Sequence, residues 1–448
     1  MKGLNKNINM AKIRPFTGIR YNLNLITDIS LVTSPPYDVI SHHDQKMYYE
    51  KHENNIIRLI LGLEYPGDNE TGNKYTRAKN YFKDWQKKDI LISDDTPSIY
   101  LYSQEFTLKG HKEAQILHGF ICLVKLEDFS SGIICPHEQT LSAPKKDRFE
   151  LMRNCEANFS QIYGLYSDKK FQIEKFLNPI FKTPPLIKTP DKDGVKNELW
   201  KVSDIDVINQ ITTLMKDKVI VIGDGHHRYE TALNYKNERK NNNPSHTGQE
   251  PYNYVMFMLV NAEDPGLTIL PTHRLLHNLS DLNMKSLMNQ ISEYFEITKL
   301  DYDIESEITI SRKMVEIGKT KHAFCLYAGK DDYYLLVLKD EKAIERYTDK
   351  SKSDVWQKLD VAILHNFIIE QFLDIGHHHL KDGKHIVYNH NFNDCIERVN
   401  KGEFQLALFL NPTHPDEVME ISGQGELMPQ KSTYFYPKLL TGLVINKL

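Results

Sequence analysis

The sequence predicts an α/β protein with more than one domain. Short apolar runs rich in β-branched residues, such as residues 219–222 and 254–260, are typical of strands buried on both faces. Residues 73–89 and 203–215 carry apolar side chains three and four positions apart, which indicates amphipathic helices. After Leu276 the alternation of helix and strand patterns begins again. We therefore divide the chain into a domain over residues 1–275 and a smaller C-terminal α/β domain over residues 276–448.

Composition narrows the class of partner. A chain of 448 residues with a net charge of −4 does not have the strongly basic balance of a general nucleic-acid or membrane-surface binder. No apolar run approaches the roughly 18 residues of a membrane span. The five cysteines are scattered and form no CxxC pair, so we expect neither a disulfide framework nor a zinc ribbon. These features favour a cytoplasmic protein that does not bind nucleic acid or membranes, and a homodimer stays open.

The densest concentration of chemistry lies at residues 218–233, KVIVIGDGHHRYETAL. A buried strand at residues 219–222 runs into two glycines, and a helix is expected from Tyr229. A strand that enters a helix through a glycine turn presents free N–H groups and the positive end of the helix dipole to an anion. A purely structural turn is the alternative, but the number of polar groups here favours a phosphate or carboxylate site. Its candidate residues are Gly223, Asp224, Gly225, His226, His227 and Arg228.

A second candidate is the loop PPYDVI at residues 35–40. Residues 31–33 resemble a strand, which Pro35 and Pro36 would end because proline lacks the backbone donor. Ser41 is a good N-cap for a following helix. Asp38 is then either part of a rigid turn or an ionised carboxylate at the edge of the sheet where α/β proteins bind ligands. From this loop alone the two interpretations are equal.

Two further polar clusters follow. Residues 134–153 contain His137 and Glu138, and then a predicted helix from residue 142 or 143 to Arg153. Its first turns carry Lys145, Lys146 and Arg148, against the preference of a helix N-terminus for acids, so an anion site is slightly favoured over a solvated charge run. The second cluster is a basic strip near the C-terminus with Lys431, Ser432, Thr433 and Lys438. Arg274 also follows a predicted strand. No P-loop, HExxH or nucleophile elbow is present, and the histidines 377–379 make a poor zinc site.

The two short signatures PPYDVI and GDGHHRYETAL resemble those of a known superfamily. The second is similar to the phosphate-binding segment of ParB/sulfiredoxin-like proteins, and its DGHHR form resembles that of the free L-serine kinases within that superfamily. Together with PHEQTLSAPKKDR and MPQKSTYFYPK, the whole chain resembles a large bacterial family long carried as a domain of unknown function. The resemblance implies a ParB/sulfiredoxin-like mixed-sheet core with a large inserted segment around residues 70–200.

It also implies roles for the candidate residues. The turn at 223–228 would bind donor phosphates, with Asp224 on Mg²⁺ and with Lys145, Lys146 and Arg148 as further cations. The kinases use a glutamate near the first box as general base. PPYDVI has no glutamate, so Asp38 is the first candidate and Glu138 the second. The substrate-binding candidates are Tyr37, His137, Arg274, Lys431, Ser432 and Thr433, and the tail of the C-terminal domain is a candidate to complete the site.

The resemblance implies phosphorylation of free L-serine to O-phosphoserine. The residues are compatible with such a reaction, because phosphoryl transfer needs positioning and charge neutralisation from N–H groups, Arg, Lys and a metal. Lys145, Lys146, Arg148 and Lys431 are more cationic groups than the γ-phosphate of ATP alone requires. Pyrophosphate, ADP and ATP therefore all stay open as donors. Two other functions stay open as well. One is a ParB-like regulatory module that binds phosphate or nucleotide without turnover, and the other is a phosphatase acting on a small phosphoester.

Overall fold

The structure is a computed structural model that describes residues 11–139, 142–280, 282–300, 306–330, 332–347, 349–373, 375–376 and 384–448. The chain forms two compact units. Unit 1 takes in the described residues up to Pro136, those between Thr140 and Leu267, and the C-terminal tail, Pro437–Leu448. Unit 2 consists of His137–Gln139 and Thr268–Tyr436. The predicted boundary at residues 275/276 therefore falls inside unit 2, and the last residues of the chain belong to unit 1.

Unit 1 is built on a nine-stranded mixed sheet in the order β6-β11-β8-β12-β5-β4-β10-β9, with β1 paired to β5. The strands are β1 (Ile13–Arg14), β4 (Ile99–Phe106), β5 (Gln115–Lys125), β6 (Ile134–Pro136), β8 (Ile162–Tyr166), β9 (Ile187–Pro190), β10 (Lys196–Val202), β11 (Ile220–Asp224) and β12 (Tyr254–Asn261). β11 runs parallel to β6, and β12 runs parallel to β8, whereas the remaining pairs are antiparallel. The predicted α/β class with a mixed-sheet core is confirmed.

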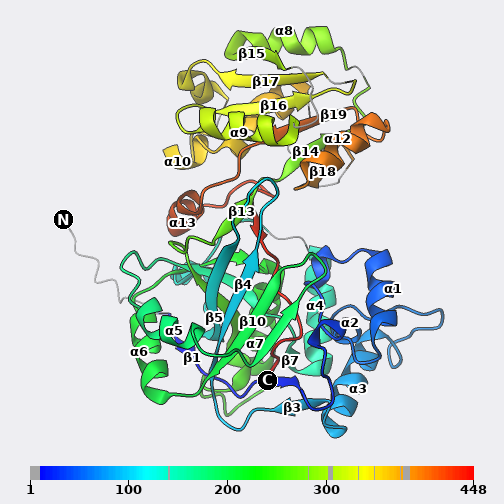
Figure 1. Ribbon diagram of the computed structural model, residues 1–448, viewed down its shortest axis with the longest axis vertical. Helices are drawn as coiled ribbons and strands as arrows, with labels where there is room; N and C mark the ends of the chain where they lie inside the picture. The colour runs from blue at the N-terminus through cyan, green and yellow to red at the C-terminus, as the bar shows by residue number, and fades with distance from the viewer. Residues whose placement is uncertain are drawn as a thin grey trace. The chain divides into compact units, whose positions relative to one another are not determined.

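Helices and short elements complete unit 1. They are β2 (Ile19–Tyr21), η1 (Ile29–Leu31), η2 (Tyr37–Val39), α1 (His42–Lys51), α2 (Ile57–Ile60), α3 (Lys74–Lys87), β3 (Leu91–Ser93), η3 (Phe129–Ser131), α4 (Ser142–Cys155), β7 (Ala157–Asn158), α5 (Glu174–Phe181), α6 (Ile205–Met215), α7 (His226–Asn241), η4 (Pro251–Asn253) and β21 (Asn446–Lys447). In Figure 1, α5 and α6 lie on one side of β4, β5 and β10, while α1 to α4 gather on the other side.

One face of this sheet carries the main hydrophobic core. Alternate residues of the strands, such as Phe257 and Ile222, pack against apolar residues of α5, α6 and α7, among them Tyr229. Burying such side chains contributes about 1.5–3 kcal/mol each, which explains why the central strands read as continuous apolar runs. The core thereby holds the end of β11 and the beginning of α7 in place.

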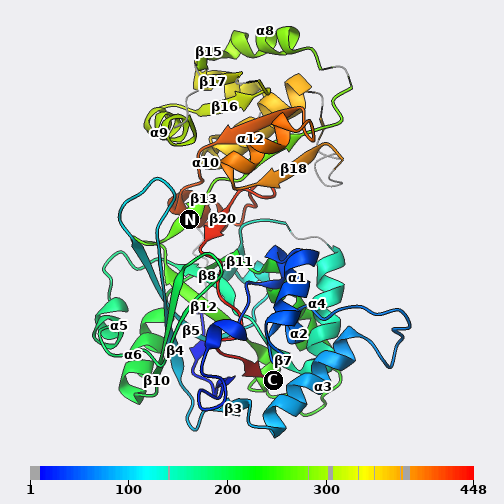
Figure 2. The same ribbon diagram turned by 45° about the vertical axis from the view of Figure 1, so that its right-hand side comes forward.

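Segments from near the two ends of the chain, around Gly18 and Leu440, contact the strand β4. Tyr100 of β4 accepts a hydrogen bond at its hydroxyl from the Gly18 N–H (2.9 Å), and the Tyr102 hydroxyl accepts one from Leu440 N–H (3.2 Å). The tail ends with β21, which pairs antiparallel with β7, and the C terminus lies beside β7 in Figures 1 and 2. The last residues of the sequence are therefore part of the packing around the sheet of unit 1.

Unit 2 holds a six-stranded antiparallel sheet in the order β15-β17-β16-β19-β14-β18. Its elements are β13 (Thr268–Leu270), β14 (His273–Leu276), α8 (Met284–Tyr294), β15 (Phe295–Leu300), α9 (Ser306–Gly318), β16 (Ala323–Tyr327), β17 (Tyr333–Leu338), η5 (Glu341–Arg346), α10 (Asp354–Gln357), α11 (Asp360–Ile363), η6 (Leu364–Phe372), β18 (Ile386–Asn389), α12 (Phe392–Asn400), β19 (Leu406–Leu410), α13 (Pro415–Gly423) and β20 (Tyr434–Tyr436). Figure 2 shows α12 over these strands, and its Cys395 and Val399 join their core.

Several local predictions differ from the structure. Residues 31–33 are not a strand: Asp28 caps the Ser30 N–H, and the 3-10 turn η1 ends at Leu31. The apolar pattern of residues 355–373 is typical of one long helix, but this segment forms three elements, because Leu359 adopts extended backbone between α10 and α11 and η6 is a π-helix. Residues 70–200, expected as an insertion, contribute β4, β5, β6, β8, β9 and β10 to the central sheet. The histidines 377–379 lie outside the described residues. Among those described, no helix is long and apolar enough to cross a membrane.

Candidate functional site

The turn between β11 and α7 is the centre of the candidate site. β11 ends at Asp224, and its register against β8 shifts between Ile222 and Asp224. Gly225 follows as N-cap with φ +93°, a left-handed conformation that favours glycine. α7 then begins at His226, three residues before the predicted start, so both histidines and Arg228 belong to its first turn. Gly225 has no side chain and therefore cannot cap the helix. The backbone N–H groups of an uncapped first turn are the groups through which helix N-termini bind anions.

Asp224 is held as a carboxylate by two cations. Its Oδ2 accepts a hydrogen bond from Lys438 Nζ at 3.0 Å, and its Oδ1 lies 3.8 Å from Arg228 Nη2. Burial alone would raise the pKa of Asp224, but Lys438 and Arg228 outweigh burial and hold that pKa well below its ordinary value. Asp224 is therefore ionised at neutral pH and can orient a lysine, a bound metal or a hydroxyl.

Arg228 is packed directly against the glycine turn. A Cβ added to Gly225 would lie 2.8 Å from Arg228 Nε and 2.9 Å from its Cζ, so the close approach requires glycine at this position. The Arg228 side chain is 10% exposed, and Nη1 donates a hydrogen bond to the Gln161 carbonyl. The guanidinium is thus fixed in one orientation beside the helix N-terminus, where its planar donors suit a phosphate or carboxylate.

The PPYDVI loop lies in the same unit and within electrostatic range of this turn. The Arg148 guanidinium stacks over the Tyr37 ring at 3.9 Å from the ring centroid. Burial, and next the charge of Asp38, raises the pKa of Tyr37 to about 12. Arg148, Arg228 and Asp224 also act on that pKa. Asp38 itself is exposed in η2, so its carboxylate is open to a ligand.

The cations of α4 are largely engaged in ion pairs. Arg148 donates to Asp147 and, through Nη1, to the Ile60 carbonyl at 2.6 Å. Lys145 pairs with Glu230 of α7, and Lys146 is exposed. Lys145 and Arg148, two of the three cations predicted to bind an anion at the start of α4, therefore already have partners within the protein.

The other predicted residues gather in unit 2. His137 Nε2 lies 2.9 Å from Thr433 Oγ1, and its carbonyl accepts from the Met428 N–H at 2.8 Å. Glu138 Oε2 accepts from the Lys431 N–H at 3.2 Å, where Lys431 has a positive φ of +57°. Ser432 is buried, and its hydroxyl donates to the Pro429 carbonyl. The sequence clusters PHEQ and PQKST are thus in direct contact.

Arg274 braces the same segment. It is fully buried in β14, where Nε donates to His365 Nε2 at 3.0 Å and Nη2 donates to the Lys431 carbonyl at 3.3 Å. Nη1 donates to the Thr272 carbonyl. Burial lowers the pKa of Arg274 to about 10. These contacts favour a positioning role for Arg274, since it holds the backbone next to Ser432 and Thr433.

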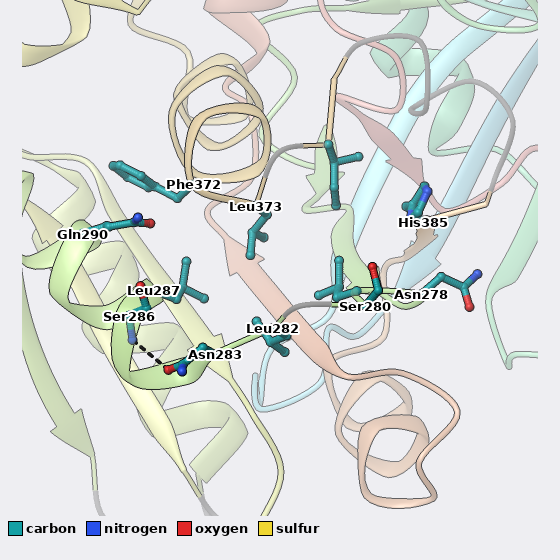
Figure 3. A pocket seen from close by; sticks show the side chains of 12 residues that line it. Asn278, Ser280, Leu282, Asn283, Ser286, Leu287, Gln290, Phe372, Leu373 and His385 are labelled. Atoms are coloured by element: carbon teal, nitrogen blue, oxygen red, sulfur yellow. Dashed lines mark hydrogen bonds between the residues drawn. The ribbon is translucent and has the colours of Figure 1, made fainter.

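A cavity in unit 2 has different chemistry. It has a volume of about 400 Å³ in unit 2, and Figure 3 shows Leu282, Leu287 and Leu373 around it, with Asn278 and His385 to one side. None of the described residues that line it is Lys, Arg, Asp or Glu. A phosphate needs cationic or N–H donors, so charge favours the α7 turn over this cavity as the candidate phosphate site.

A metal ion would need ligands from outside the protein. Within the described residues, no three His, Cys, Asp or Glu side chains come together as a metal site. Asp224 offers one carboxylate. Mg²⁺ is commonly bound by one or two carboxylates together with substrate phosphates and waters, so the residues fit a Mg²⁺ ion that arrives with the donor.

Lys438 is the residue that the site assignment from sequence left out. The sequence indicates Lys438 only as one residue of the basic strip near the C-terminus. Its contact with Asp224 spans 214 positions, and no local spacing indicates such a pairing. The signal available was its charge directly after Pro437, in a segment that is otherwise largely apolar.

Comparison with known proteins gives the family. The profile described as "Protein of unknown function (DUF1015)" matches residues 13–362, which is most of the chain. The chain belongs to that family. No curated protein matches it.

The solved structures that match this chain have low identity and low TM-scores. A free serine kinase in complex with AMP is 13% identical, covers 73% of this chain and 91% of its own, and has a TM-score of 0.36. A conserved hypothetical protein from Pyrococcus furiosus is 13% identical, with 70% and 90% covered and a TM-score of 0.33. C-terminally truncated SbnI from Staphylococcus aureus is 9% identical, with 72% and 85% covered and a TM-score of 0.34.

Proposed function

We propose that this protein is a small-molecule kinase that phosphorylates the hydroxyl of free L-serine, with a nucleotide or pyrophosphate as donor. The observation that carries the proposal is the cluster around Tyr37. The Arg148 guanidinium stacks over the Tyr37 ring at 3.9 Å, and the next residue, Asp38, is exposed. Arg228 and Asp224 of the α7 turn are close enough to Tyr37 to act on its pKa, so an exposed carboxylate and these cations surround the same side chain. A base beside a phosphate-binding turn is the arrangement that phosphoryl transfer requires.

The donor phosphates would bind at the beginning of α7. The helix N-terminus supplies N–H groups and a positive dipole, and Lys438 and Arg228 supply positive charge on the side of Asp224. These groups are held in place before any ligand arrives, so they neutralise charge in the transition state without reorganisation. Mg²⁺, when bound with the donor, would neutralise further phosphate charge, and Asp224 would hold it.

Asp38 would act as the general base. Its carboxylate is exposed in η2 and would accept the proton of the acceptor hydroxyl as that oxygen attacks the transferred phosphorus. Glu138, the second candidate, already accepts the Lys431 N–H within unit 2, which favours a positioning role for it. The choice of L-serine as acceptor rests on the resemblance of DGHHR to the motif of the free L-serine kinases.

Phosphorus NMR tests the proposal. The protein is incubated with L-serine, Mg²⁺ and, in turn, ATP, ADP or pyrophosphate, and the expected product is O-phosphoserine. Asp38→Asn should lower kcat by about a hundredfold or more while donor binding stays unchanged. Glu138→Gln is the matched control and should retain most of the turnover. No product with any donor, despite measurable donor binding, would contradict a kinase and favour a binding module.

A further inference from the structure

A cavity of about 90 Å³ in unit 1 lies next to the beginning of the PPYDVI loop. Segments that are far apart in the sequence line it, among them Pro35, Tyr48, Lys51, Asp191, Lys192 and Leu440. A water needs about 10–15 Å³ of such space, so the cavity has room for about six to nine waters, or for one ligand with a similar number of heavy atoms. The class of ligand that fits is therefore a small polar molecule.

Tyr48 of α1 is a buried residue of this lining with an unused hydroxyl. The residue is 3% exposed, and its hydroxyl makes no hydrogen bond to any residue that the structure describes. Tyrosine hydroxyls in buried positions usually have a partner. Burial, and next the negative charge of Asp44, holds the pKa of Tyr48 well above its ordinary value. The hydroxyl is therefore protonated and can donate a hydrogen bond to a ligand.

Asp191, in the turn between β9 and β10, has a carboxylate with one oxygen still available. Its Oδ1 accepts from the Asp193 N–H at 2.8 Å and from the Val195 N–H at 2.9 Å, which fixes the carboxylate in the turn. Its Oδ2 accepts from none of the residues that the structure describes. Burial raises the pKa of Asp191, and a cation beside Oδ2 would favour the ionised form. The ammonium group of a ligand is such a cation.

The cavity also has positive charge in its lining. Lys51 forms no ion pair with a described residue, and its Nζ lies 5.8 Å from the centroid of the Tyr48 ring. Lys192 forms only a long ion pair, with 3.8 Å between its Nζ and Asp44 Oδ2. A free α-amino acid, which has one ammonium and one carboxylate group, matches this mixture of charges. Pyrophosphate would instead bring only negative charge next to Asp191.

The wall of the cavity is connected to the candidate phosphate site. Pro35 lies three residues before Asp38, the candidate base, in the same loop. The Leu440 carbonyl accepts from Gln161 Nε2 at 3.3 Å. The carbonyl of Gln161 in turn accepts from Arg228 Nη1. A single residue therefore links the cavity wall to the α7 turn.

We propose that this cavity binds the acceptor amino acid, with the α-ammonium group on Asp191 and the α-carboxylate on Tyr48 and Lys51. The proposal rests on the proposed kinase function and assigns the acceptor class, a small free α-amino acid. An amino acid held by both charged groups leaves its side-chain hydroxyl for the loop that carries Asp38. Ethanolamine lacks the carboxylate and 3-hydroxypropionate lacks the ammonium group, so each of these alcohols loses one of the two charged contacts.

Calorimetric titration of L-serine, ethanolamine and 3-hydroxypropionate into the full-length protein tests the assignment. One variant is Asp191→Asn, which keeps Oδ1 for the two N–H groups, and the other is Tyr48→Phe, which removes only the unpaired hydroxyl. Tyr81→Phe is the matched control, because it loses the same group from a residue that does not line the cavity. We expect L-serine to bind and each analogue to bind at least about tenfold more weakly. The affinity for L-serine should fall at least about tenfold in Asp191→Asn and Tyr48→Phe, and stay unchanged in Tyr81→Phe.

Serine turnover separates this inference from the proposed function. Binding of L-serine that Asp191→Asn and Tyr48→Phe both weaken, without formation of O-phosphoserine from any donor, would support the cavity and reject the kinase. Turnover with an unchanged KM for L-serine in both variants would support the kinase and overturn the cavity assignment. Equal binding of L-serine and ethanolamine, or no binding of L-serine to the wild type, would overturn it as well.

Discussion

Lys438 Nζ lies 3.0 Å from Asp224 Oδ2, although the two residues are 214 positions apart in the sequence. The Lys438 backbone is held by Gln104 Nε2, which donates to its carbonyl at 3.1 Å, and the following residues are tied to β4 through Tyr102. The C-terminal tail is therefore a structural part of the candidate site, and it delivers a cation to the end of β11.

Replacing Lys438 should disable the site without unfolding the protein. Lys438→Met removes the ammonium that holds Asp224, so the pKa of Asp224 should rise, and kcat/KM should fall by about a hundredfold. Lys447→Met is the matched control, because Lys447 is exposed in the same tail. Steady-state kinetics and circular dichroism of both variants check this. Equal activity in the two variants would remove Lys438 from the site.

Gly225 should tolerate no side chain. Gly225→Ala forces alanine into a left-handed conformation, at a cost of about 1–2 kcal/mol, and also places a methyl group against the Arg228 guanidinium. Gly248→Ala is the control, since Gly248 has φ +84° and nothing lies within 4 Å of its added Cβ. Chemical denaturation should show a loss of stability in both variants. Donor affinity should fall only in Gly225→Ala, and a fall in both would show that contact with Arg228 is not the cause.

Local chemistry made the strand–glycine turn–helix unit at residues 219–241 predictable from sequence. The apolar run at 219–222, the two glycines and the following polar residues all act within a few positions, and the structure has β11, a left-handed Gly225 and α7 there. The same holds for the Ser41 cap of α1, where Ser41 accepts the Asp44 N–H. The signal in these cases is short-range, and tertiary packing does not oppose it.

Long-range contacts explain what sequence could not supply. Nothing local indicates that Lys438 meets Asp224, that Arg148 stacks on Tyr37, or that His137 meets Thr433. The prediction of a strand at residues 31–33 was also wrong. Val32 and Thr33 have high β-propensity, but the Asp28 cap and the burial of Ile29 stabilise a turn there. The inserted segment around residues 70–200 was implied by the family resemblance alone, and these residues contribute β4, β5, β6, β8, β9 and β10 to the central sheet.

Stability at low pH should depend on Asp147. This carboxylate accepts from Tyr75 at 2.8 Å and pairs with Lys74 at 2.8 Å and with Arg148. Burial would raise its pKa, but Arg148 and Lys74 outweigh burial and lower the pKa from 3.8 to about 2. Because the pKa of Asp147 is lower in the folded protein than in the unfolded chain, its ionised form stabilises the fold by about 2 kcal/mol at pH values above the unfolded pKa. This contribution is lost as the pH falls from about 4 to 2.

Asp147→Asn should therefore lower the free energy of unfolding by about 2 kcal/mol at pH 7 and change it little near pH 2. Asp95→Asn serves as control, because Asp95 is 82% exposed and its pair with Lys201 should contribute little. Urea denaturation across this pH range measures both. A deficit in Asp147→Asn that stays constant down to pH 2 would reject the ionic origin of the effect.

The central claim is that the N-terminus of α7 binds the donor phosphates, and calorimetric titration tests it most directly. Pyrophosphate, ADP and ATP are each titrated, with Mg²⁺, into the wild type and into Arg228→Lys, which keeps the charge but loses the planar donors. The account predicts saturable binding of at least one donor by the wild type and an affinity at least about tenfold weaker in Arg228→Lys. Binding of equal affinity in both proteins, or no binding of any of the three to the wild type, would contradict it.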